Sequence, residues 1–544
     1  MSVVFLQRPT DGCAGGGWSG LVAEALERME ATTERTLCLE PGEFRIRASA
    51  CSERFCAVSN HDSDVRRVAF DFSGRSNFVF DGQGADLRFV GRVIPFFLEG
   101  CRNVVLRNFT VDWERPFFTE GIVCDVRGRS QVVLEIDEGR YPVAMRGGMF
   151  RFVGDDYESG VFDNSIEVDA QTGAVAASSW DCWGIRENHR MTPAGPSRYL
   201  LEAPFLSEAV EGNRIVLPHE LRTSPALVLS RSDTVLIEDC ELRQAGGMGV
   251  IAQMCRDVTL RRMRVAPSPD RGCFTSLNGD ATHFVECTGR IELLDCAFSG
   301  QLDDGSNVHG VYLKIVSVRG GHELLAAVGQ AQQSSVDYFR AGDVVGLVNP
   351  ENFLPEAVMT ISSVRRVDAG HQVFTMCEPL PDFAAGRVLG SLGRAVDFCA
   401  GGCRFERSRT DGLLLSAPGR LEVRDNEFSI PGRGITVTCD ASEWYESGPV
   451  GELTVSRNVF RDCSYGTRPD PAAICAAPND SHSSARDSVV HRQIVIRDNA
   501  FHGRRPFVSL YRSEARIEGN HFAGAGGIHD PEGAIVHPGK GQTG

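Results

Sequence analysis

Three aspartates recur at the spacing of one structural repeat in the middle of this 544-residue chain. Asp280 lies in the run GDATHF, and Asp303 and Asp304 follow it by 23 and 24 residues in QLDDGSNVHG. Coils of a solenoid stack about 4.8 Å apart, so carboxylates at this spacing are expected on neighbouring rungs, within roughly 10 Å of each other. Such a group can hydrolyse a glycosidic bond, with one protonated acid for the leaving oxygen and one carboxylate as base or nucleophile. Repulsion between like charges raises one carboxyl pKa and keeps that acid protonated near neutral pH.

The plainer interpretation of these aspartates is turn structure, because Asp-Gly, as in Asp304-Gly305, is a common turn pair. Their shared spacing and their polar neighbours favour a site, and the candidate substrate-binding neighbours are His283, Asn307, His309 and Lys314. The two histidines could be metal ligands, acid–base groups or sugar contacts, and His283 could equally be a satisfied, partly buried residue. We expect sugar contacts, because no third ligand follows at metal spacing. The sequence therefore predicts neither a metal nor a cofactor.

A second group of sugar-binding candidates lies in CDASEWYESGP, residues 439–449. The large apolar face of Trp444 could stack on a pyranose ring, and Asp440 and Glu446 could bind hydroxyl groups. The alternative is a loop that is anchored by a buried tryptophan.

Two further runs carry charged residues at the ends of expected strands. In RTDGLLL, Arg409 and Asp411 stand where a coil begins, and a sugar contact and a plain turn are equally compatible with them. In DWERP, residues 112–116, a structural junction is favoured over a site.

A recurring unit of alternating apolar residues predicts the fold that positions these candidates. Copies read NVVLRNFTV (103–111), VLIEDCEL (235–242), VTLRRMRV (258–265), IELLDCAF (291–298), LEVRDNEF (421–428), LTVSRNVF (453–460), IVIRDNAF (494–501) and ARIEGNHF (515–522). Repeats of about 20 to 30 residues with one short strand each are typical of a β-solenoid. One slot of the unit holds Asn426, Asn458, Asn499 and Asn520. We expect these side chains to hydrogen-bond along a ladder while apolar residues fill the core.

The repeat divides the chain into segments. Residues 1–116 contain WSGLVAEALERMEA, an amphipathic helix predicted to cap the first coil, and the first coils themselves. Residues 227–315, with the catalytic candidates, and residues 395–544 carry the repeat. Residues 117–226 and 316–394 lack it and alternate like hairpins, so we expect two small inserted β-barrel domains. Such insertions often build a solenoid's binding cleft.

The composition limits the kinds of molecule that this protein can bind. A formal net charge of −16 excludes nucleic acid, because phosphate binding needs a basic surface, and favours a neutral sugar over a polyuronate. No apolar run of about 18 residues predicts a membrane helix. The 18 cysteines are interpreted mainly as small buried hydrophobes. Together with the lack of a recognisable secretory signal, they favour a cytoplasmic location; an omitted leader would make it secreted or periplasmic. Solenoid sides can pair, so a homodimer is plausible.

The sequence resembles the bacterial α-1,3-galactosidases of glycoside hydrolase family 110, which remove the blood-group-B galactose. The matching runs are FTVDWERPFFTEG, GDATHFVEC, QLDDGSNVHGVYL and DASEWYESGP, and the resemblance extends from about residue 77 to 522. It implies an all-β fold, a right-handed parallel β-helix interrupted by two β-barrel modules. It also implies exo-hydrolysis of terminal α-1,3-linked galactose with inversion and without a metal. The family's catalytic aspartates fall on Asp280, Asp303 and Asp304. Which of them is the acid stays open, and Asp303 and Asp304 could divide base and orienting roles.

Three other functions remain compatible with a β-helix. A polygalacturonase-like glycosidase also uses aspartates on adjacent coils, but its NTD, GHG and RIK runs are not found in order. A polysaccharide lyase would want a basic side chain at the site, for which Lys314 is the central lysine. A non-catalytic solenoid could bind galactosides without releasing sugar, since fold does not fix function.

Overall fold

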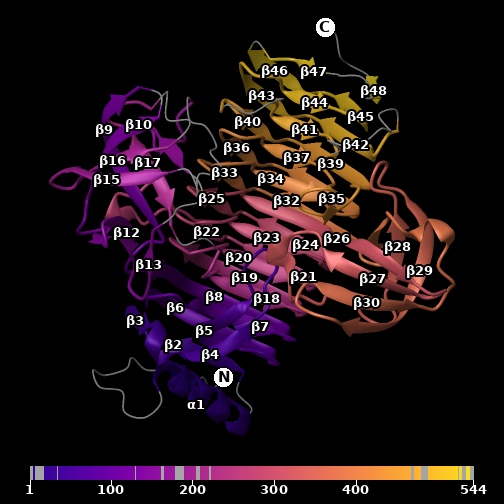
Figure 1. The fold of residues 1–544 in the computed structure, drawn as a ribbon, viewed down its shortest axis with the longest axis horizontal. Helices are drawn as coiled ribbons and strands as arrows, with labels where there is room; N and C mark the ends of the chain where they lie inside the picture. Colours follow the sequence, from indigo (N-terminus) through magenta and orange to yellow (C-terminus); the bar gives the residue numbers. More distant parts are fainter. Residues whose placement is uncertain are drawn as a thin grey trace.

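The computed structural model shows a right-handed parallel β-helix with an N-terminal helix and two inserted β-sheet modules (Figure 1). This is the predicted fold class. The structure describes residues 4–6, 17–32, 35–128, 130–160, 165–177, 189–203, 209–219, 222–466, 471–479, 488–524, 526–529 and 535–538. In Figure 1 the N-terminal helix lies at one end of the β-helix and the last strands lie at the other. No helix in the described ranges has the length and apolar character needed to cross a membrane.

The helix α1 (Gly17–Thr32) closes the first coil, as the sequence predicts. Trp18, Val22 and Leu26 recur every four residues and form its buried face. The indole of Trp18 meets the ring of Phe70 edge-on, with 5.3 Å between the ring centroids. The helix thus shields the apolar interior that the first coil would otherwise expose to water.

One long parallel sheet runs along the whole β-helix. Its strands are β1 (Val4–Leu6), β2 (Thr36–Leu39), β3 (Glu43–Arg47), β6 (Ser76–Val90), β8 (Arg102–Trp113), β19 (Asp233–Leu242), β21 (Arg256–Arg261), β22 (Arg264–Val265), β24 (Thr288–Leu294), β25 (Ala297–Ser299), β32 (Val396–Gly401), β33 (Arg404–Glu406), β35 (Gly419–Arg424), β36 (Glu427–Ser429), β39 (Glu452–Ser456), β40 (Val459–Arg461), β42 (His491–Arg497), β43 (Ala500–Gly503), β45 (Ser513–Glu518), β46 (His521–Gly524) and β48 (Ile535–Pro538). The predicted repeat units lie on this sheet. Their alternate apolar residues, such as Val235 and Ile237, are buried in the core.

A second face of the β-helix carries the site. Its strands are β4 (Ser52–Cys56), β5 (Asp64–Asp71), β7 (Ile94–Glu99), β18 (Leu227–Ser230), β20 (Val250–Gln253), β23 (Thr282–Val285), β26 (Ser306–Arg319), β34 (Leu413–Ser416), β37 (Ile435–Val437), β41 (Ile474–Ala476), β44 (Val508–Leu510) and β47 (Ile528–His529). From β5 onward they pair in parallel, one per coil. Inward residues such as Phe284, Val308 and Leu415 join the core. Their neighbours in sequence therefore face outward.

Side-chain ladders hold the later coils in register, as the repeat predicts. The backbone N–H and the side-chain amide of Asn426 donate to Oδ1 of Asn458 at 3.0 and 2.9 Å. Asn458 and Asn499 continue the same pattern to Asn520. In the core, the rings of Phe405, Phe428, Phe460 and Phe501 stack face to face with 4.8 to 4.9 Å between successive centroids.

The first inserted module lies between β8 and β19. Its strands are β9 (Phe118–Arg127), β10 (Gln131–Ile136), β11 (Val143–Arg146), β12 (Met149–Val153), β13 (Glu158–Ser159), β14 (Ile166–Val168), β15 (Arg190–Gly195), β16 (Arg198–Glu202) and β17 (Arg214–Pro218). Six of them form an antiparallel sheet in the order β14-β17-β9-β10-β16-β15, and β11, β12 and β13 form a smaller sheet. The β-helix continues past this module, because β8 pairs directly with β19.

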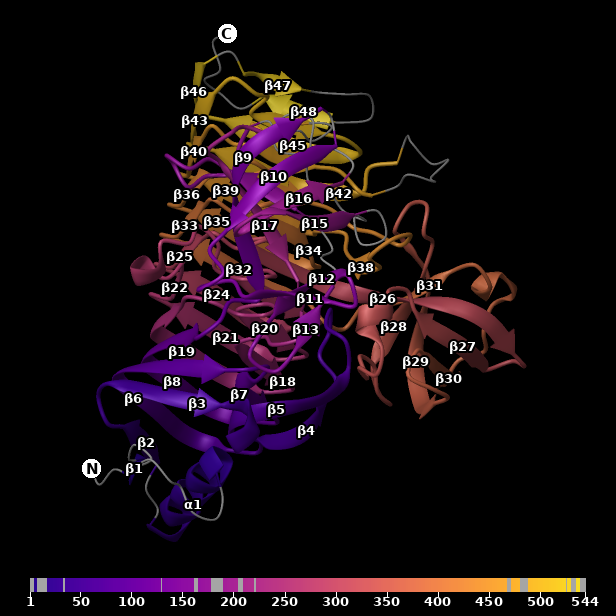
Figure 2. The same ribbon diagram turned by 60° about the vertical axis from the view of Figure 1, so that its left-hand side comes forward.

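The second module is a closed antiparallel barrel on the other side of the β-helix in the view of Figure 1. It consists of the second half of β26 together with β27 (Glu323–Val328), β28 (Val344–Val348), β29 (Pro355–Arg366), β30 (His371–Met376) and β31 (Val388–Ser391). Figure 2 shows how far it projects. The strand β26 belongs to both parts: residues 306–309 pair with β34, and from Tyr312 onward the strand pairs within the barrel.

Candidate active site

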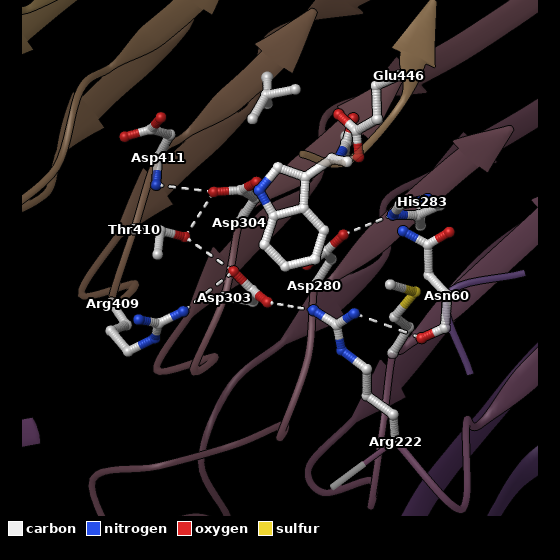
Figure 3. Close-up of a pocket in the computed structure, with 14 residues that line it drawn as sticks. Asn60, Arg222, Asp280, His283, Asp303, Asp304, Arg409, Thr410, Asp411 and Glu446 are labelled. Carbon is white, nitrogen blue, oxygen red and sulfur yellow. Dashed lines mark hydrogen bonds and ion pairs between the residues drawn. The ribbon is translucent and has the colours of Figure 1, made fainter. Parts of the chain in front are cut away.

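The three predicted catalytic aspartates meet at one corner of the β-helix (Figure 3). Asp280 precedes β23, and Asp303 and Asp304 precede β26 on the next coil. The backbone N–H of Ala281 donates to the carbonyl of Asp304 at 2.9 Å, which fixes the stacking of the two coils. One carboxylate oxygen from each aspartate lies within 4.8 Å of the others. The spacing of one coil therefore places the acids side by side, as expected.

The next coil adds a residue of the same kind. The backbone N–H of Gly305 donates to the carbonyl of Asp411 at 2.9 Å, so Asp411 occupies the rung position that Asp304 and Asp280 hold on the earlier coils. Its backbone N–H donates to Oδ1 of Asp304 at 2.9 Å, and the hydroxyl of Thr410 donates to the same oxygen at 2.5 Å. Asp304 is thus held through Oδ1, which accepts both of these hydrogen bonds.

Asp303 is bound by two guanidinium groups. Arg222, which follows the first module, lies 2.8 Å from Oδ2, and Arg409 lies 3.3 Å from Oδ1. Both arginines are buried, whereas Asp303 is the most accessible of the three aspartates. Three carboxylates this close could also surround a cation, but the two guanidinium groups already bring positive charge to Asp303. We therefore assign no metal here.

Asp280 is connected to both predicted histidines. Its Oδ2 lies 2.6 Å from Nδ1 of His283, and Nε2 of His283 lies 2.8 Å from Nε2 of His309. Nδ1 of His309 lies 2.7 Å from the carbonyl oxygen of Gly310. Only His283 reaches the cavity wall, so His309 stands behind it and the structure does not place it as a sugar contact.

Burial shifts the ionisation of this cluster. Loss of water contact, followed by the charges of Asp303 and Asp304, raises the pKa of Asp280 well above its usual range. Burial, followed by the charges of Asp303 and Asp411, raises the pKa of Asp304 to about 8. Burial lowers the pKa of His283. Carboxyl groups of this cluster therefore stay partly protonated at neutral pH, which a general acid requires.

The cavity beside these acids has a volume of about 200 Å³. This is smaller than pockets for drug-sized ligands, which begin at about 300 Å³, and it suits a single small ring. Its walls are formed by Asn60, Arg222, Met248, Asp280, His283, Asp303, Asp304, Asn307, Arg409, Thr410, Asp411, Leu414, Trp444 and Glu446. The predicted residues Asn307, Arg409, Trp444 and Glu446 thus line it together with the aspartates.

The loop that carries Trp444 is organised by Asp440. The carboxylate of Asp440 accepts hydrogen bonds from backbone N–H groups of residues 442–445, including that of Trp444. Asp440 does not line the cavity, so its placement differs from the hydroxyl contact that the sequence suggests. The short strand β38 (Glu446–Ser447) then pairs with β26 at Val311 and brings Glu446 to the wall. The amide of Asn307 donates to Glu446 at 3.3 Å.

Lys314 is placed away from the site. It lies in the barrel half of β26, where Leu313 and Ile315 are buried and Lys314 is exposed. A strand turns alternate residues to opposite faces, so Lys314, five residues after His309, is on the wrong face as well as in the wrong module. It is not among the residues that line the cavity.

Sequence reasoning missed several wall residues. Asn60 comes from the loop between β4 and β5, and Arg222 from the turn after the first module. Neither belongs to a repeat unit, so no spacing pointed to them. Thr410 was also missed, whereas its neighbour Asp411 was named together with Arg409 as a possible sugar contact. The signal that could have placed Asp411 beside Asp304 is the Asp-Gly pair that each of them begins, Asp304-Gly305 and Asp411-Gly412.

The first inserted module matches a known protein family. The family model described as GLAA-B beta-barrel domain I matches residues 119–215, which is the first module. Among solved structures, the A-module of the mannuronan C-5 epimerase AlgE4 from Azotobacter vinelandii has a TM-score of 0.46 at 10% identity, covering 98% of this chain and 100% of that chain.

Curated relatives match over most of the chain. Alpha-1,3-galactosidase A of Shewanella woodyi is 30% identical over 464 residues, which cover 85% of this chain and 75% of the relative. Alpha-1,3-galactosidase B of Bacteroides thetaiotaomicron is 25% identical over 489 residues, which cover 88% and 79%. Because the first of these relatives is 30% identical over most of both chains, the chain belongs to the alpha-1,3-galactosidase family, glycoside hydrolase family 110.

Proposed function

We propose that this protein is an exo-acting glycoside hydrolase that removes terminal α-1,3-linked galactose with inversion of configuration. The main support for this proposal is the cluster of Asp280, Asp303 and Asp304 at the wall of a small cavity. One carboxylate oxygen from each lies within 4.8 Å of the others. Membership of the family and the names of the relatives support galactose as the sugar.

The size of the cavity supports cleavage at a terminal sugar residue. It has room for about one ring, and Trp444 forms part of its wall. An indole presents a broad apolar face that a galactose ring could cover. Guanidinium and amide groups from Arg409, Asn60 and Asn307 surround the same volume and can bind hydroxyl groups.

The spacing of the acids supports activation of a water molecule. Two carboxyl groups in an inverting glycosidase are commonly about 6.5–9.5 Å apart, and the oxygens here are closer than that. A water that donates to two carboxylate oxygens at ~2.7 Å bridges a gap of about 4.5 Å. The observed separation leaves room for a water that two of these oxygens share, but it is shorter than the spacing typical of inverting enzymes. Inversion is therefore proposed from the family resemblance. Attack by this water, while a third carboxyl protonates the leaving oxygen, would invert the anomeric centre.

The test is hydrolysis of a panel of galactosides followed by proton NMR. We expect free galactose from α-1,3-linked substrates, and we expect β-galactose to appear before mutarotation. Release of α-galactose first would overturn the inverting mechanism. Substrates linked α-1,4, α-1,6 and β serve as controls for the linkage.

The same panel separates the other candidate functions. Arg222 and Arg409 do supply basic groups near the acids, as a lyase would need, although both are engaged by Asp303. An unsaturated product that absorbs in the ultraviolet would favour a lyase. Cleavage of polygalacturonate would favour a polygalacturonase-like enzyme. Binding of galactosides without any product would favour a non-catalytic solenoid.

A further inference from the structure

Asp280, His283 and His309 form a hydrogen-bonded chain that ends on a backbone carbonyl. All three side chains are almost completely buried, with side-chain exposures of 3%, 1% and 0%. The register of β23 and β26 sets the chain, because Val285 pairs with His309 and His283 pairs with Asn307. The two imidazoles therefore lie diagonally on adjacent rungs, with ring centroids 4.8 Å apart and planes at 82°.

The end of the chain fixes where the protons are. A carbonyl oxygen only accepts, so the 2.7 Å contact with Gly310 requires a proton on Nδ1 of His309. The contact between the two Nε2 atoms requires one proton, and the contact between Asp280 and His283 requires another. Three hydrogen bonds thus contain three protons. An ionised aspartate with two neutral imidazoles supplies only two, so the chain binds one extra proton and has zero net charge.

The extra proton has two end positions. In the first, Asp280 is a carboxylic acid that donates to His283, and His283 donates through Nε2 to neutral His309. In the second, the acid proton of Asp280 has moved to Nδ1 of His283, and the proton on Nε2 of His283 has moved to Nε2 of His309. Asp280 is then a carboxylate, His283 is neutral, and His309 is an imidazolium. Only the positions of two hydrogens differ between these forms, and no heavy atom needs to move.

Charged groups around the chain make the second form accessible. Oε1 of Glu446 lies 3.8 Å from Nε2 of His309, and buried Glu286 is held by the backbone N–H of Val311 next to the chain. An ionised Glu446 would attract the charge of the second form, whereas Glu286 is already paired with Arg394 at 3.0 Å. The ionisable groups that face the chain are Asp303 and Asp304 before β26, Arg222 after the first module, His61 after β4, Glu286 after β23 and Glu446 on β38.

We propose that His283 and His309 are a proton relay that switches Asp280 between carboxylic acid and carboxylate, and thereby prepares it to act as the base. The proposal rests on the proposed function. In the hydrolytic step, the water oxygen bonds to the anomeric carbon and the bond to the glycosidic oxygen breaks. The leaving oxygen gains a proton from an acidic carboxyl group, and the water loses one to Asp280. The proton that Asp280 has gained then passes to the carboxyl group that lost one to the leaving oxygen. Transfer of the relay protons back to Asp280 then restores the resting form. Both histidines act as positioning residues in this relay, and His283 also lines the cavity, where a sugar contact stays a prediction.

The proton count is tested in the whole protein by NMR of ¹⁵N-labelled histidine. We expect protonated Nδ1 on His309, and a far-downfield proton shared by Asp280 and His283 that disappears in Asp280→Asn. A spectrum in which Nδ1 of His309 is unprotonated would overturn the relay. This measurement needs no substrate, so it stands even if wild-type protein releases no galactose, a result that would count against the proposed function alone.

Kinetics tests the switch itself. His309→Gln places an amide near the Nε2 position, where it can bond to His283 but cannot take up a proton. We expect kcat to fall on the order of 10²-fold with a changed pH profile and a nearly constant KM. His309→Asn places its side-chain amide near the Nδ1 position, where it can still donate to the carbonyl of Gly310. We expect the same loss of kcat for this variant, and a melting temperature near that of the wild type for both variants. His491→Asn, at a buried histidine of a distant coil, should leave the pH profile unchanged. An unchanged kcat, or a loss confined to KM, would overturn the proposal.

Discussion

The guanidinium group of Arg222 lies 2.8 Å from the carboxylate of Asp303, although 81 residues separate them in sequence. Arg222 also donates to the side chain of Gln332 in the second module and to the carbonyl of Asn60. One side chain therefore joins the end of the first module, the second module and the acidic corner of the β-helix.

Replacement of Arg222 by Met should move the acidic limb of the kcat/KM profile to higher pH. A nearby cation stabilises carboxylates, so its removal raises the pKa values of the acidic cluster, and a higher pH is then needed to ionise the base. We expect activity near neutral pH to fall on the order of 10²-fold. Arg222→Lys keeps the charge and should shift the limb less. The control is Arg231→Met, at an exposed arginine nine positions later in the sequence. Equal pH profiles for the two Met variants would contradict the prediction.

Replacement of Asp304 by Asn should abolish most of the activity without unfolding the protein. The amide oxygen can still accept from Thr410 and Asp411, so the corner should keep its shape. General acid or base catalysis is worth about 10²- to 10⁴-fold, and we expect a loss in kcat of that order. Asp397→Asn removes an exposed carboxylate on β32 and should have no effect. Full activity of the Asp304 variant would remove this residue from the mechanism.

The same substitution should stabilise the fold at neutral and alkaline pH. Because the pKa of Asp304 is raised to about 8 in the folded protein, its protonated form stabilises the fold fully below pH about 4, and this contribution is lost as the pH rises to about 8. Asn has no proton to lose. Its advantage should grow from pH 5 to pH 8 and reach on the order of 4 kcal/mol at pH 7.

Thermal unfolding of wild type and variant across this pH range measures the difference. Coupling with Asp280 spreads the titration over both groups, so the midpoint belongs to the pair. A constant difference in melting temperature would show that Asp304 does not titrate in this window.

Replacement of Trp444 by Ala should raise KM more than it lowers kcat. The indole is part of the cavity wall, and an apolar face that covers the sugar ring contributes binding in the ground state and the transition state alike. Trp444→Phe retains an aromatic face and should lose less. A large fall in kcat with constant KM would instead give the loop a role in the chemical step.

Replacement of Asn458 by Ala should destabilise the C-terminal coils. Its side chain donates to the carbonyl of Val423 and to Asn499, and it accepts two hydrogen bonds from Asn426. Removal leaves buried partners unsatisfied, at a cost of about 1–3 kcal/mol for each such group. Urea unfolding measures the loss, and Arg461→Ala, at the exposed end of β40, is the control. Equal midpoints for both variants would contradict a structural ladder.

The stacked strands and the acidic corner could be predicted from the sequence because both follow the repeat. Alternation with a period of two identifies the inward residues, and the asparagine slot marks a turn in the C-terminal coils. A separation of one coil then places Asp280 beside Asp304 without knowledge of any loop. The same alternation places Lys314 and His309 on opposite faces of their strand. Applied to the sequence, this rule would have removed Lys314 from the candidate sugar-binding residues.

The remaining parts of the site depend on long-range contacts that no repeat encodes. Arg222 and Asn60 reach the cavity from connecting segments, and their positions follow from how the modules close over the β-helix. Asp440 was recognised as part of the right loop, but its role inside that loop depends on which backbone N–H groups turn toward it. A pattern of residue types does not contain that information.

Direct pairing of β8 with β19, and of β24 with β32, makes the order of assembly discontinuous. During synthesis, β8 and later β24 emerge from the ribosome before their partner strands. In each case a whole module is synthesised before the strand that pairs with them. Each delay exposes an unpaired strand edge, which is where a nascent chain is most prone to aggregate. Rapid independent closure of each module would bring its two ends together and shorten the effective loop that the next rung has to close.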